Sequence, residues 1–492
     1  MIDPKFAAKV QAYPRVALVL QGGGALGSYQ AGVYEGLAHA GIHPNWVAGI
    51  SIGALNCAII AGNAPEKRVE KLHEFWNTIC SPPVSPAGWL EEMFTGARST
   101  ADKAADAEES TSGFNPMTGF FGVYSPIANP WLSMFDGAAH TMFGSMAAMS
   151  AIVNGQTGFF KPRAMAPGGG TPDQTSFYDT SPIIETLERF ADFDRINSGE
   201  TRVSLGATNV ASGNFVYFDS QDTKLTPKHF IASGSLPPGF PATEIDGEYY
   251  WDGGCVSNTP LEYVTSTTPR KDTLVFQVDL WSAEGPLPKD IFQVNERLKD
   301  IQYSSRTRTV TNTVHLAQRM RKALLDTISR IPPDVREKDP WFQEVVQRMM
   351  GSRYNVIHLI YRNKASEGHY KDYEFSYETM RMHWQTGQHD MFETLAFPEC
   401  LDMPAEGENF VTFDIHTRKR SSAQFNDRHH NPYAVNTQDS MPTDTTGATQ
   451  THRSQSDKPG KSAVKTAGAR RTPAKSAVRS SGSRKRPPQD RE

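Results

Sequence analysis

A serine stands at the centre of Gly-Ile-Ser-Ile-Gly at residues 49–53. A serine hydroxyl held on a tight turn can attack an acyl carbonyl when a nearby base accepts its proton. That attack puts negative charge on the former carbonyl oxygen, which backbone N–H groups can stabilise. An earlier run, Gly-Gly-Gly-Ala-Leu-Gly at residues 22–27, can offer such groups because glycine permits tight loops and close approach to the backbone. The two motifs together indicate acyl transfer through Ser51.

The residues around each motif predict the same succession of strand, tight loop and helix. Residues 15–21 are apolar and β-branched, which is typical of a buried strand, and residues 28–40 carry apolar side chains close to a helical stripe. Residues 46–50 predict a second strand, and residues 52–61 a small, apolar, buried helix. Ser51 is therefore expected on a strand-to-helix elbow.

A dinucleotide-binding domain is the first alternative, since Gly22, Gly24 and Gly27 match its glycine fingerprint. The fingerprint also needs an acidic residue about 20 positions on, at the end of the second strand, to hold the ribose. No acidic residue occurs between Glu35 and Glu66. The nucleotide-binding interpretation is therefore disfavoured.

An α/β-hydrolase with a Ser, acid and His triad is the second alternative, because its nucleophile lies on the same kind of elbow. Several strands precede the elbow in that fold, whereas a single strand precedes Ser51 here. A third interpretation is an enzyme with a Ser–Asp pair, in which the first strand ends in the oxyanion loop and the second in the nucleophile. The order of the motifs favours this third interpretation.

A candidate base follows in Trp-Asp-Gly-Gly at residues 251–254. Two glycines after Asp252 allow a sharp turn that can face the carboxylate into a cleft, whereas Asp246-Gly247 is more typical of a hairpin turn. The small and proline-rich segment 232–241 suits a rigid loop lining a pocket. The chain has 14 histidines, but none falls in the three motifs, so a dyad is favoured over a triad.

With these motifs in this order, residues 12–270 resemble the patatin-like phospholipase family. The segments Ala-Ser-Gly-Ser-Leu-Pro at 232–237 and Tyr-Asp-Thr-Ser-Pro at 178–182 also look like landmarks of the family. The resemblance implies an α/β fold, a three-layer sandwich with a mainly parallel central sheet. It implies a lipid acyl hydrolase with Ser51 as nucleophile and Asp252 as base, and no cofactor or metal.

The resemblance also assigns the glycine motifs. It implies an oxyanion hole formed by the first motif and the start of the helix after Ser51, with the residues Gly22, Gly23, Gly24, Ala25, Gly27 and Ile52. It implies structural glycines in the other two motifs, at Gly49, Gly53, Gly253 and Gly254. One position departs from the family, because many members carry Lys or Arg where this chain has Leu26. The backbone would therefore have to stabilise the oxyanion without that cation.

The expected chemistry leaves the final acceptor open. A free aspartate has a pKa of about 3.9, so an efficient base needs a partly desolvated site that raises the pKa of Asp252. Water as the acceptor of the acyl group makes the protein a hydrolase, and another acceptor makes it an acyltransferase. A non-catalytic lipid-binding or scaffolding protein is the rival from another class. The sequence does not select the lipid class or the oligomeric state.

The chain divides into four expected parts. Residues 1–12 are an N-terminal lead, and residues 13–270 form the catalytic domain, with an insertion of lid-like composition at 97–175. Residues 271–420 resemble an uncharacterised α/β extension of some bacterial patatin-like proteins. Strands are predicted at 273–280 and 355–361, an amphipathic helix from Ile291 to Ile301 with a basic helix after it, and a helix capped by Ser376.

Residues 421–492 predict a disordered basic tail. Residues 451–492 hold 12 Lys or Arg against 3 Asp or Glu, whereas the rest of the chain is acidic. A solvated tail is favoured over one that binds anionic lipid, and nucleic acid is disfavoured as a partner. No signal peptide or run of about 20 apolar residues occurs, and the four cysteines lack metal-site spacing. We therefore expect a cytoplasmic protein whose partner is a lipid or other acyl ester and whose membrane contact, if any, is peripheral.

Overall fold

The computed structural model describes residues 4–80, 144–163, 170–349, 352–362, 367–405 and 409–414. All of them belong to one compact unit, Met1–Asp427. The predicted loop at 97–112, most of the apolar segment that follows it and the basic tail at 421–492 lie outside the described residues. The predicted boundaries at residues 97 and 420 lie outside them as well, whereas the chain can be followed through the boundary at 270.

Nine strands of the described residues form one sheet. Its order along the main path is β11 (Phe410–Phe413), β10 (Tyr354–Ile360), β9 (Thr273–Asp279), β1 (Arg15–Leu20), β2 (Trp46–Gly49), β5 (Arg202–Asn209), β8 (Glu248–Asp252) and β7 (Thr243–Ile245), with β6 (Phe215–Asp219) paired to β5. The run from β11 to β5 is parallel, and β6, β7 and β8 are antiparallel to their neighbours. A separate two-stranded sheet joins β3 (Lys161–Pro162) to β4 (Tyr178–Asp179). The predicted mainly parallel sheet is confirmed.

Alternation along the strands gives the sheet two buried faces. Side chains of successive strand residues point to opposite faces, so Val16, Leu18 and Leu20 of β1 join one hydrophobic core, and Ala17 and Val19 join another. Every residue of β1 is buried. A strand buried on both faces favours apolar side chains at successive positions, which is why residues 16–20 form a continuous apolar run.

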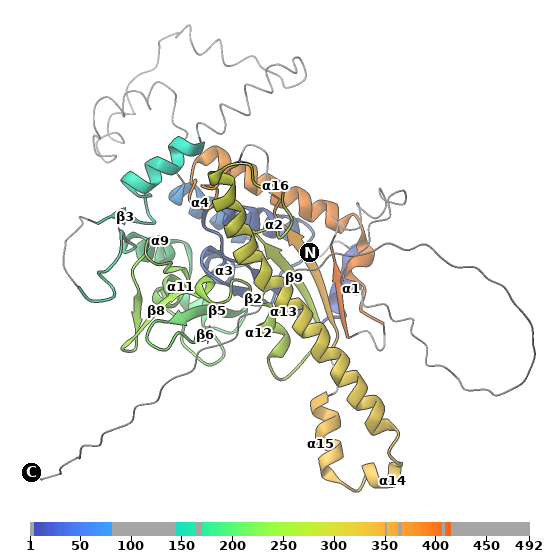
Figure 1. Cartoon of the computed structure of the whole chain (residues 1–492). Coiled ribbons are helices and arrows are strands. Elements are labelled where there is room, and N and C mark those ends of the chain that lie inside the picture. The colour runs from blue at the N-terminus through green and yellow to red at the C-terminus, as the bar shows by residue number, and fades with distance from the viewer. Residues whose placement is uncertain are drawn as a thin grey trace, which may run out of the picture. The chain divides into compact units, whose positions relative to one another are not determined.

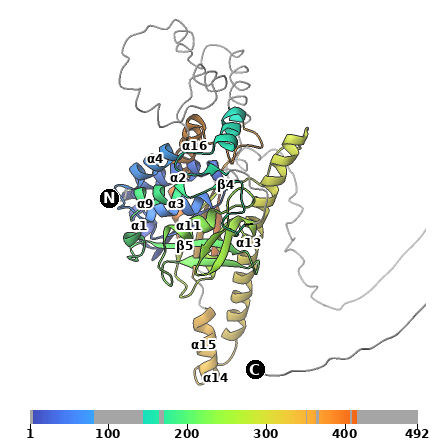
Figure 2. The same ribbon diagram turned by 90° about the vertical axis from the view of Figure 1, so that its left-hand side faces the viewer.

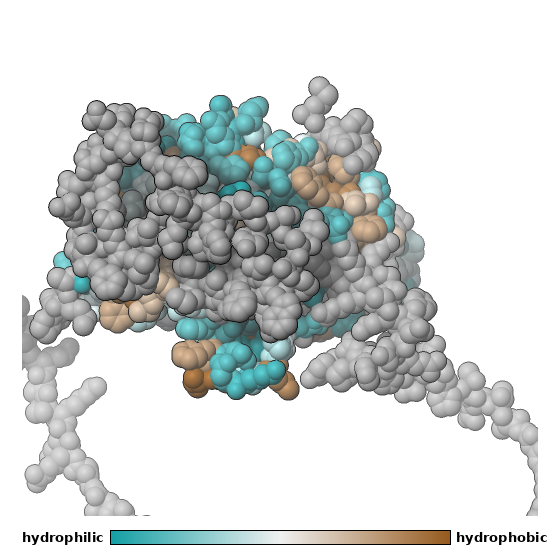
Figure 3. All heavy atoms as spheres, turned by 90° about the horizontal axis from the view of Figure 1, so that it is seen from above, coloured by the Kyte–Doolittle hydropathy of each residue, from teal (hydrophilic) through white to brown (hydrophobic). Residues whose placement is uncertain are grey.

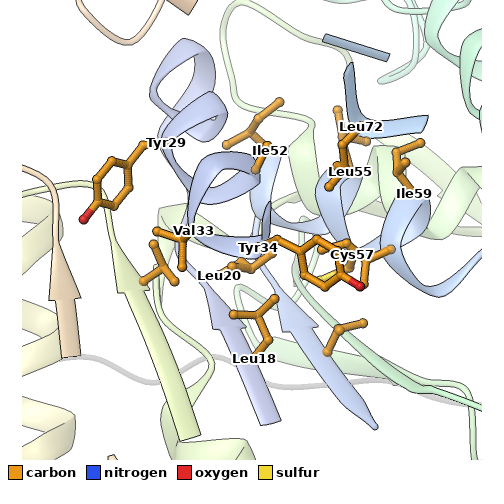
Figure 4. Packing of buried hydrophobic residues seen from close by; sticks show 14 of the residues in the cluster. Leu18, Leu20, Tyr29, Val33, Tyr34, Ile52, Leu55, Cys57, Ile59 and Leu72 are labelled. Atoms are coloured by element: carbon orange, nitrogen blue, oxygen red, sulfur yellow. The ribbon is translucent and has the colours of Figure 1, made fainter. Parts of the chain in front are cut away.

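Helices cover both faces, and Figure 1 shows them on either side of the sheet. The larger core lies under α2 (Gly27–His39), α3 (Ile52–Ala61), α4 (Arg68–Ile79), α9 (Pro182–Phe190), α11 (Pro227–Gly234) and α16 (Tyr377–Leu395), with the short α1 (Pro4–Gln11) and α10 (Phe193–Ile196) at its margin. Figure 4 shows side chains of α2, α3 and α4 packed against those of β1. Leu261 and Val264 of α12 (Leu261–Ser266) cover the other face. The arrangement is the predicted three-layer α/β fold.

The sheet continues through the predicted boundary at residue 270. β9 pairs with β1 on one side and with β10 on the other, so residues 271–414 extend the same sheet. The connections are α13 (Ile291–Ser329), α14 (Pro333–Arg336) and α15 (Pro340–Met349), followed after β10 by α16 and the 3-10 helix η3 (Pro398–Leu401). The predicted extension and the predicted catalytic domain therefore share one sheet.

Two predictions for this region have different outcomes. The helix capped by Ser376 is confirmed, since the Ser376 Oγ accepts a hydrogen bond from the Thr379 N–H at 3.3 Å. The two consecutive helices expected after Ile291 are wrong, because α13 is a single helix of 39 residues. It contains no glycine or proline that would end a helix between its apolar and basic halves. Figure 2 shows its length, with α15 lying beside its C-terminal half.

The coloured residues on the face seen from above are of both kinds, hydrophobic and hydrophilic (Figure 3). Of the helices that the structure describes, none joins the length and the apolar character that crossing a bilayer requires.

Candidate active site

The parallel strands β1 and β2 bring the first two sequence motifs to one edge of the sheet, whereas the third motif begins at the end of β8, which runs antiparallel to β5. In the registers, Leu20 of β1 lies opposite Gly49 of β2 and opposite Val278 of β9. The chain leaving β1 at Gly22 therefore lies between the serine that follows β2 and the residues that follow β9. A Cβ added to Gly22 would stand 3.0 Å from the Ser51 Cβ, so the first two motifs are in direct contact.

Ser51 occupies the expected elbow between β2 and α3. Its backbone has φ 55° and ψ −125°, a conformation that residues with a side chain rarely adopt. Such a conformation costs about 1–3 kcal/mol and persists only when its surroundings impose it. Here the Ser51 N–H donates to the backbone oxygen and the Oγ of Ser233, each at 3.1 Å. Gly49 and Gly53 permit the turn, since a Cβ on either would lie 2.5 Å from backbone atoms.

Asp252 ends β8 beside this elbow, and its side chain is almost fully buried, with 2% of the residue exposed. One carboxylate oxygen accepts the Gly254 N–H at 2.6 Å, and the Ser51 side chain is a second hydrogen-bond partner. Burial raises the pKa of Asp252 to about 6, and the two hydrogen bonds limit the rise because they favour the charged form. The desolvation required of a base is therefore present.

The loop after β1 turns its peptide groups in two directions. The carbonyl of Gly23 accepts the Leu26 N–H at 3.2 Å, and Gly27 donates its N–H to the carbonyl of Gly24. In the described part of the chain, no acceptor lies on the N–H groups of Gly23 and Gly24, and both residues line the cavity beside Ser51. Two such N–H groups are the kind of donor that an oxyanion requires.

The other residues predicted for the oxyanion hole do not all offer a free N–H group to the cavity. The prediction for Ala25 is corrected, because its N–H donates to the backbone oxygen of Asp372 at 2.9 Å and is not available to a substrate. Gly22 donates to the backbone oxygen of Asn258 at 3.4 Å, and Gly27 packs on Ile52, where a Cβ would lie 2.5 Å from a side-chain carbon. Ile52 is the first residue of α3, so its N–H has no acceptor one helical turn earlier.

Gly24 is the position in this loop that most requires glycine. Its φ of +56° disfavours any side chain, and a Cβ there would stand 2.0 Å from the Asp372 backbone oxygen. The contact joins the loop to the segment before α16, far away in the sequence.

A cavity of about 340 Å³ opens beside Ser51 and Asp252. Its walls come mainly from aromatic, aliphatic and proline side chains, among them Leu55, Phe159, Phe160, Phe240 and Phe375. The predicted pocket-lining loop at 232–241 takes part through residues 234 and 236–240, although 232–234 form the end of α11. No histidine lines the cavity in the described residues.

Comparison with known families agrees with this site. The family described as patatin-like phospholipase matches residues 18–265, which contain all three motifs. The chain belongs to this family. A second family, described as patatin phospholipase, matches residues 301–407. Among solved structures, the chain is similar to VipD from Legionella pneumophila, with 15% identity over 75% of this chain and 67% of that one and a TM-score of 0.28. No curated protein matches the sequence.

As a patatin-like phospholipase, this chain differs at the position of the frequent cation. Leu26 is fully buried in the larger hydrophobic core, so its side chain does not face the cavity. The N–H groups of Gly23 and Gly24 therefore have no cation beside them from this position.

The sequence motifs missed several residues that shape this patatin-like site. Asn258 and Trp281 donate to the Gly22 carbonyl at 3.1 and 2.8 Å, and Asp372 holds Ala25. Trp281 could have been found from sheet order, since it follows a predicted strand whose C-terminal end adjoins the loop. Asp372 carries no such signal, because nothing in the local sequence places the segment before α16 against residue 25.

Proposed function

We propose that this protein is a lipid acyl hydrolase that uses Ser51 as nucleophile and Asp252 as base. The observation that carries the proposal is the pairing of a strained serine with a buried carboxylate whose pKa is raised to about 6. A base works best when its pKa lies near the working pH, and this carboxylate is about two units closer to neutrality than a free one.

The first half of the reaction forms an acyl-enzyme. The Ser51 Oγ attacks the ester carbonyl carbon as its proton passes to Asp252, and the N–H groups of Gly23, Gly24 and Ile52 stabilise the oxyanion. Collapse of the tetrahedral intermediate breaks the bond to the alcohol, and Asp252 returns the proton to the departing oxygen. In the second half, water loses a proton to Asp252 and attacks the acyl carbon. The bond from this carbon to the Ser51 Oγ then breaks, Asp252 returns the proton to Oγ, and the fatty acid leaves.

The cavity supports an acyl chain as the bound part of the substrate. Burial of CH₂ groups against aromatic and aliphatic walls contributes about 0.8 kcal/mol for each group. The charged residues of its described lining are the acidic Asp252 and Asp372, and no Lys or Arg is among them. A negatively charged headgroup would therefore lie outside the cavity, with the uncharged ester at Ser51.

The pH dependence follows from the raised pKa of Asp252. Protonated Asp252 cannot accept the serine proton, so kcat/KM for an uncharged ester should rise tenfold per pH unit below about 6 and level off above it. Initial rates measured from pH 4.5 to 8 with a substrate that does not titrate would show this. If kcat/KM instead levelled off above about pH 4, the base would be a solvent-exposed carboxylate.

Mass spectrometry of the protein and of its proteolytic peptides tests the proposed chemistry. During turnover of p-nitrophenyl decanoate, we expect an adduct of one acyl group on the peptide containing Ser51, which disappears when substrate is exhausted. Release of decanoate into water defines the hydrolase, and transfer to added glycerol or lysolipid in preference to water defines the acyltransferase alternative. Absence of both adduct and turnover would support the non-catalytic alternative.

We further propose that the protein meets its substrate by peripheral contact with a lipid surface. The helical residues 144–154 reach the cavity through Ile152, while Met149 and Val153 of the same helix are 58% and 63% exposed. Apolar side chains beside a cavity entrance can enter the headgroup region of a bilayer.

The double substitution Met149→Ser and Val153→Ser should reduce hydrolysis of vesicle lipids about tenfold. Each substitution removes roughly half of the free energy that the apolar side chain gains on entering the bilayer. Hydrolysis of a dissolved short-chain ester should not change. Val335→Ser, at an apolar residue of α14 that is 45% exposed, is the matched control. Equal losses on both substrates would contradict the membrane contact.

A further inference from the structure

The carbonyl of Gly22 is fixed by two side chains that no motif contains. The Trp281 Nε1–H donates to it at 2.8 Å and the Asn258 Nδ2–H at 3.1 Å. Trp281 is 2% exposed and Asn258 is 2% exposed, so both hydrogen bonds are shielded from water. The two lone pairs of this carbonyl oxygen are thereby both used, by side chains that also border the cavity.

The geometry of the peptide bond makes this fixation relevant to catalysis. In a trans peptide, the carbonyl of one residue and the N–H of the next lie in one plane and point in opposite directions. Holding the Gly22 carbonyl therefore sets the direction of the Gly23 N–H, which lines the cavity beside Ser51. Donors on a carbonyl also polarise the amide and strengthen its N–H as a donor.

The next peptide is held by the same principle from within the loop. The Gly23 carbonyl accepts the Leu26 N–H at 3.2 Å, so the Gly24 N–H is directed away from that bond. One peptide further, the Ala25 N–H is bound by the Asp372 backbone oxygen, and the Asp372 carboxylate is held by Lys299 at 2.8 Å through both oxygens. The loop is thus anchored at three consecutive peptide groups.

The position of Trp281 is itself built into the sheet. Gln21 follows β1, and its side-chain oxygen accepts the N–H groups of Leu280 at 2.7 Å and Trp281 at 3.2 Å. The Gln21 side-chain nitrogen donates to the Thr259 Oγ at 2.9 Å, which ties the same point to the segment containing Asn258. The three segments that surround the Gly22 carbonyl are therefore connected by one buried side chain.

We propose that Trp281 and Asn258 are positioning residues of the oxyanion hole, which direct the Gly23 N–H toward the substrate carbonyl. The proposal rests on the proposed hydrolase function and extends it beyond the matched family segments, since Trp281 lies between residues 18–265 and 301–407. This placement makes residues after 270 part of the catalytic apparatus.

Trp281→Phe tests the proposal because it removes the N–H and keeps an aromatic ring in the same space. We expect kcat for a soluble medium-chain ester to fall about tenfold with KM changed less than twofold, since a misdirected donor weakens binding of the transition state and leaves that of the substrate. Inactivation by a fluorophosphonate, whose adduct places an oxygen in the oxyanion hole, should slow by a similar factor.

Trp46→Phe is the matched control, because the Trp46 Nε1–H is equally buried and donates at 2.8 Å to the Ser204 Oγ of β5. Trp46 begins β2, at the end of the strand away from Ser51. The substitution should leave kcat within twofold. Asn258→Ala provides a second variant that does not depend on the ring, with a loss of about tenfold. Because both donors serve one oxygen, the double variant should lose more than the product of the single losses.

Three results would overturn the positioning role. These are an unchanged kcat in both single variants, a loss confined to KM, and an equal loss of kcat in Trp46→Phe. A wild-type protein that neither turns over esters nor reacts with the fluorophosphonate would overturn the proposed hydrolase function, and the positioning role with it. An active wild type with unaffected variants overturns the positioning role alone.

Discussion

Ser51→Ala is expected to lower ester hydrolysis by about 10⁴-fold or more and to abolish labelling by a fluorophosphonate. The hydroxyl is the proposed attacking group, and without it the remaining N–H donors can only polarise a bound ester. Labelling of wild-type protein, followed by identification of the modified peptide, should place the phosphonate on Ser51. Retained labelling at another serine in Ser51→Ala would contradict the assignment.

A second substitution at the same position separates chemistry from folding. Ser51→Gly should be as inactive as Ser51→Ala, but it should be more stable by about 1 kcal/mol, because glycine adopts φ 55° without a steric penalty. Thermal unfolding of the two variants in the same buffer measures the difference. Equal stabilities would show that the elbow is not strained in solution.

Asp252→Asn is expected to reduce hydrolysis by about 10³-fold or more, since an amide cannot accept the serine proton at neutral pH. The substitution keeps the size of the side chain. The amide oxygen can still accept the Gly254 N–H, and the amide N–H₂ can donate to Ser51. We therefore expect a folded protein that has lost its base. Undiminished activity in this variant would exclude Asp252 from that role.

The same variant should be more stable than wild type at neutral pH. Asp252 has a pKa of about 6 when folded, against 3.8 for a free group, so the folded state binds more protons between these values. Wild-type stability should therefore fall as pH rises from about 4 to 6, by about 3 kcal/mol in all. The amide introduced by Asp252→Asn does not titrate, so the advantage of the variant should be full at pH 7 and small at pH 4. Thermal unfolding at both values measures it.

Local patterns were sufficient for the elements around the nucleophile. The predicted strands at 15–21 and 46–50 and the helix at 52–61 correspond to β1, β2 and α3, because burial on both sides leaves an uninterrupted apolar signal. The hairpin at Asp246-Gly247 is likewise confirmed, with both residues at positive φ between β7 and β8. Cys57 of α3 is fully buried as well.

The other features of the site could not be predicted, because they depend on contacts between segments far apart in the sequence. The hydrogen bond from the Ala25 N–H to the Asp372 backbone oxygen depends on how the segment before α16 packs against the glycine loop. No local sequence pattern encodes that packing. The chemistry of a general base required a raised pKa at Asp252, but the sequence could not supply its cause, because burial comes from the packing of separate elements. The predicted boundary at residue 270 followed the extent of the family resemblance, whereas hydrogen bonding between β1 and β9 crosses it.

The place of β9 between β1 and β10 also has a consequence for how the protein is made. A chain emerging from the ribosome exposes the open edge of β1 until residues 273–279 have been synthesised, although Ser51 and Asp252, the proposed nucleophile and base, are already present. The loop at residues 22–27 is not fully anchored until Asp372 has been synthesised, because the Ala25 N–H donates to the Asp372 backbone oxygen. We therefore expect nascent chains that end before residue 372 to be inactive toward esters. The dependence on late residues would prevent an incomplete enzyme from attacking lipids during its own synthesis.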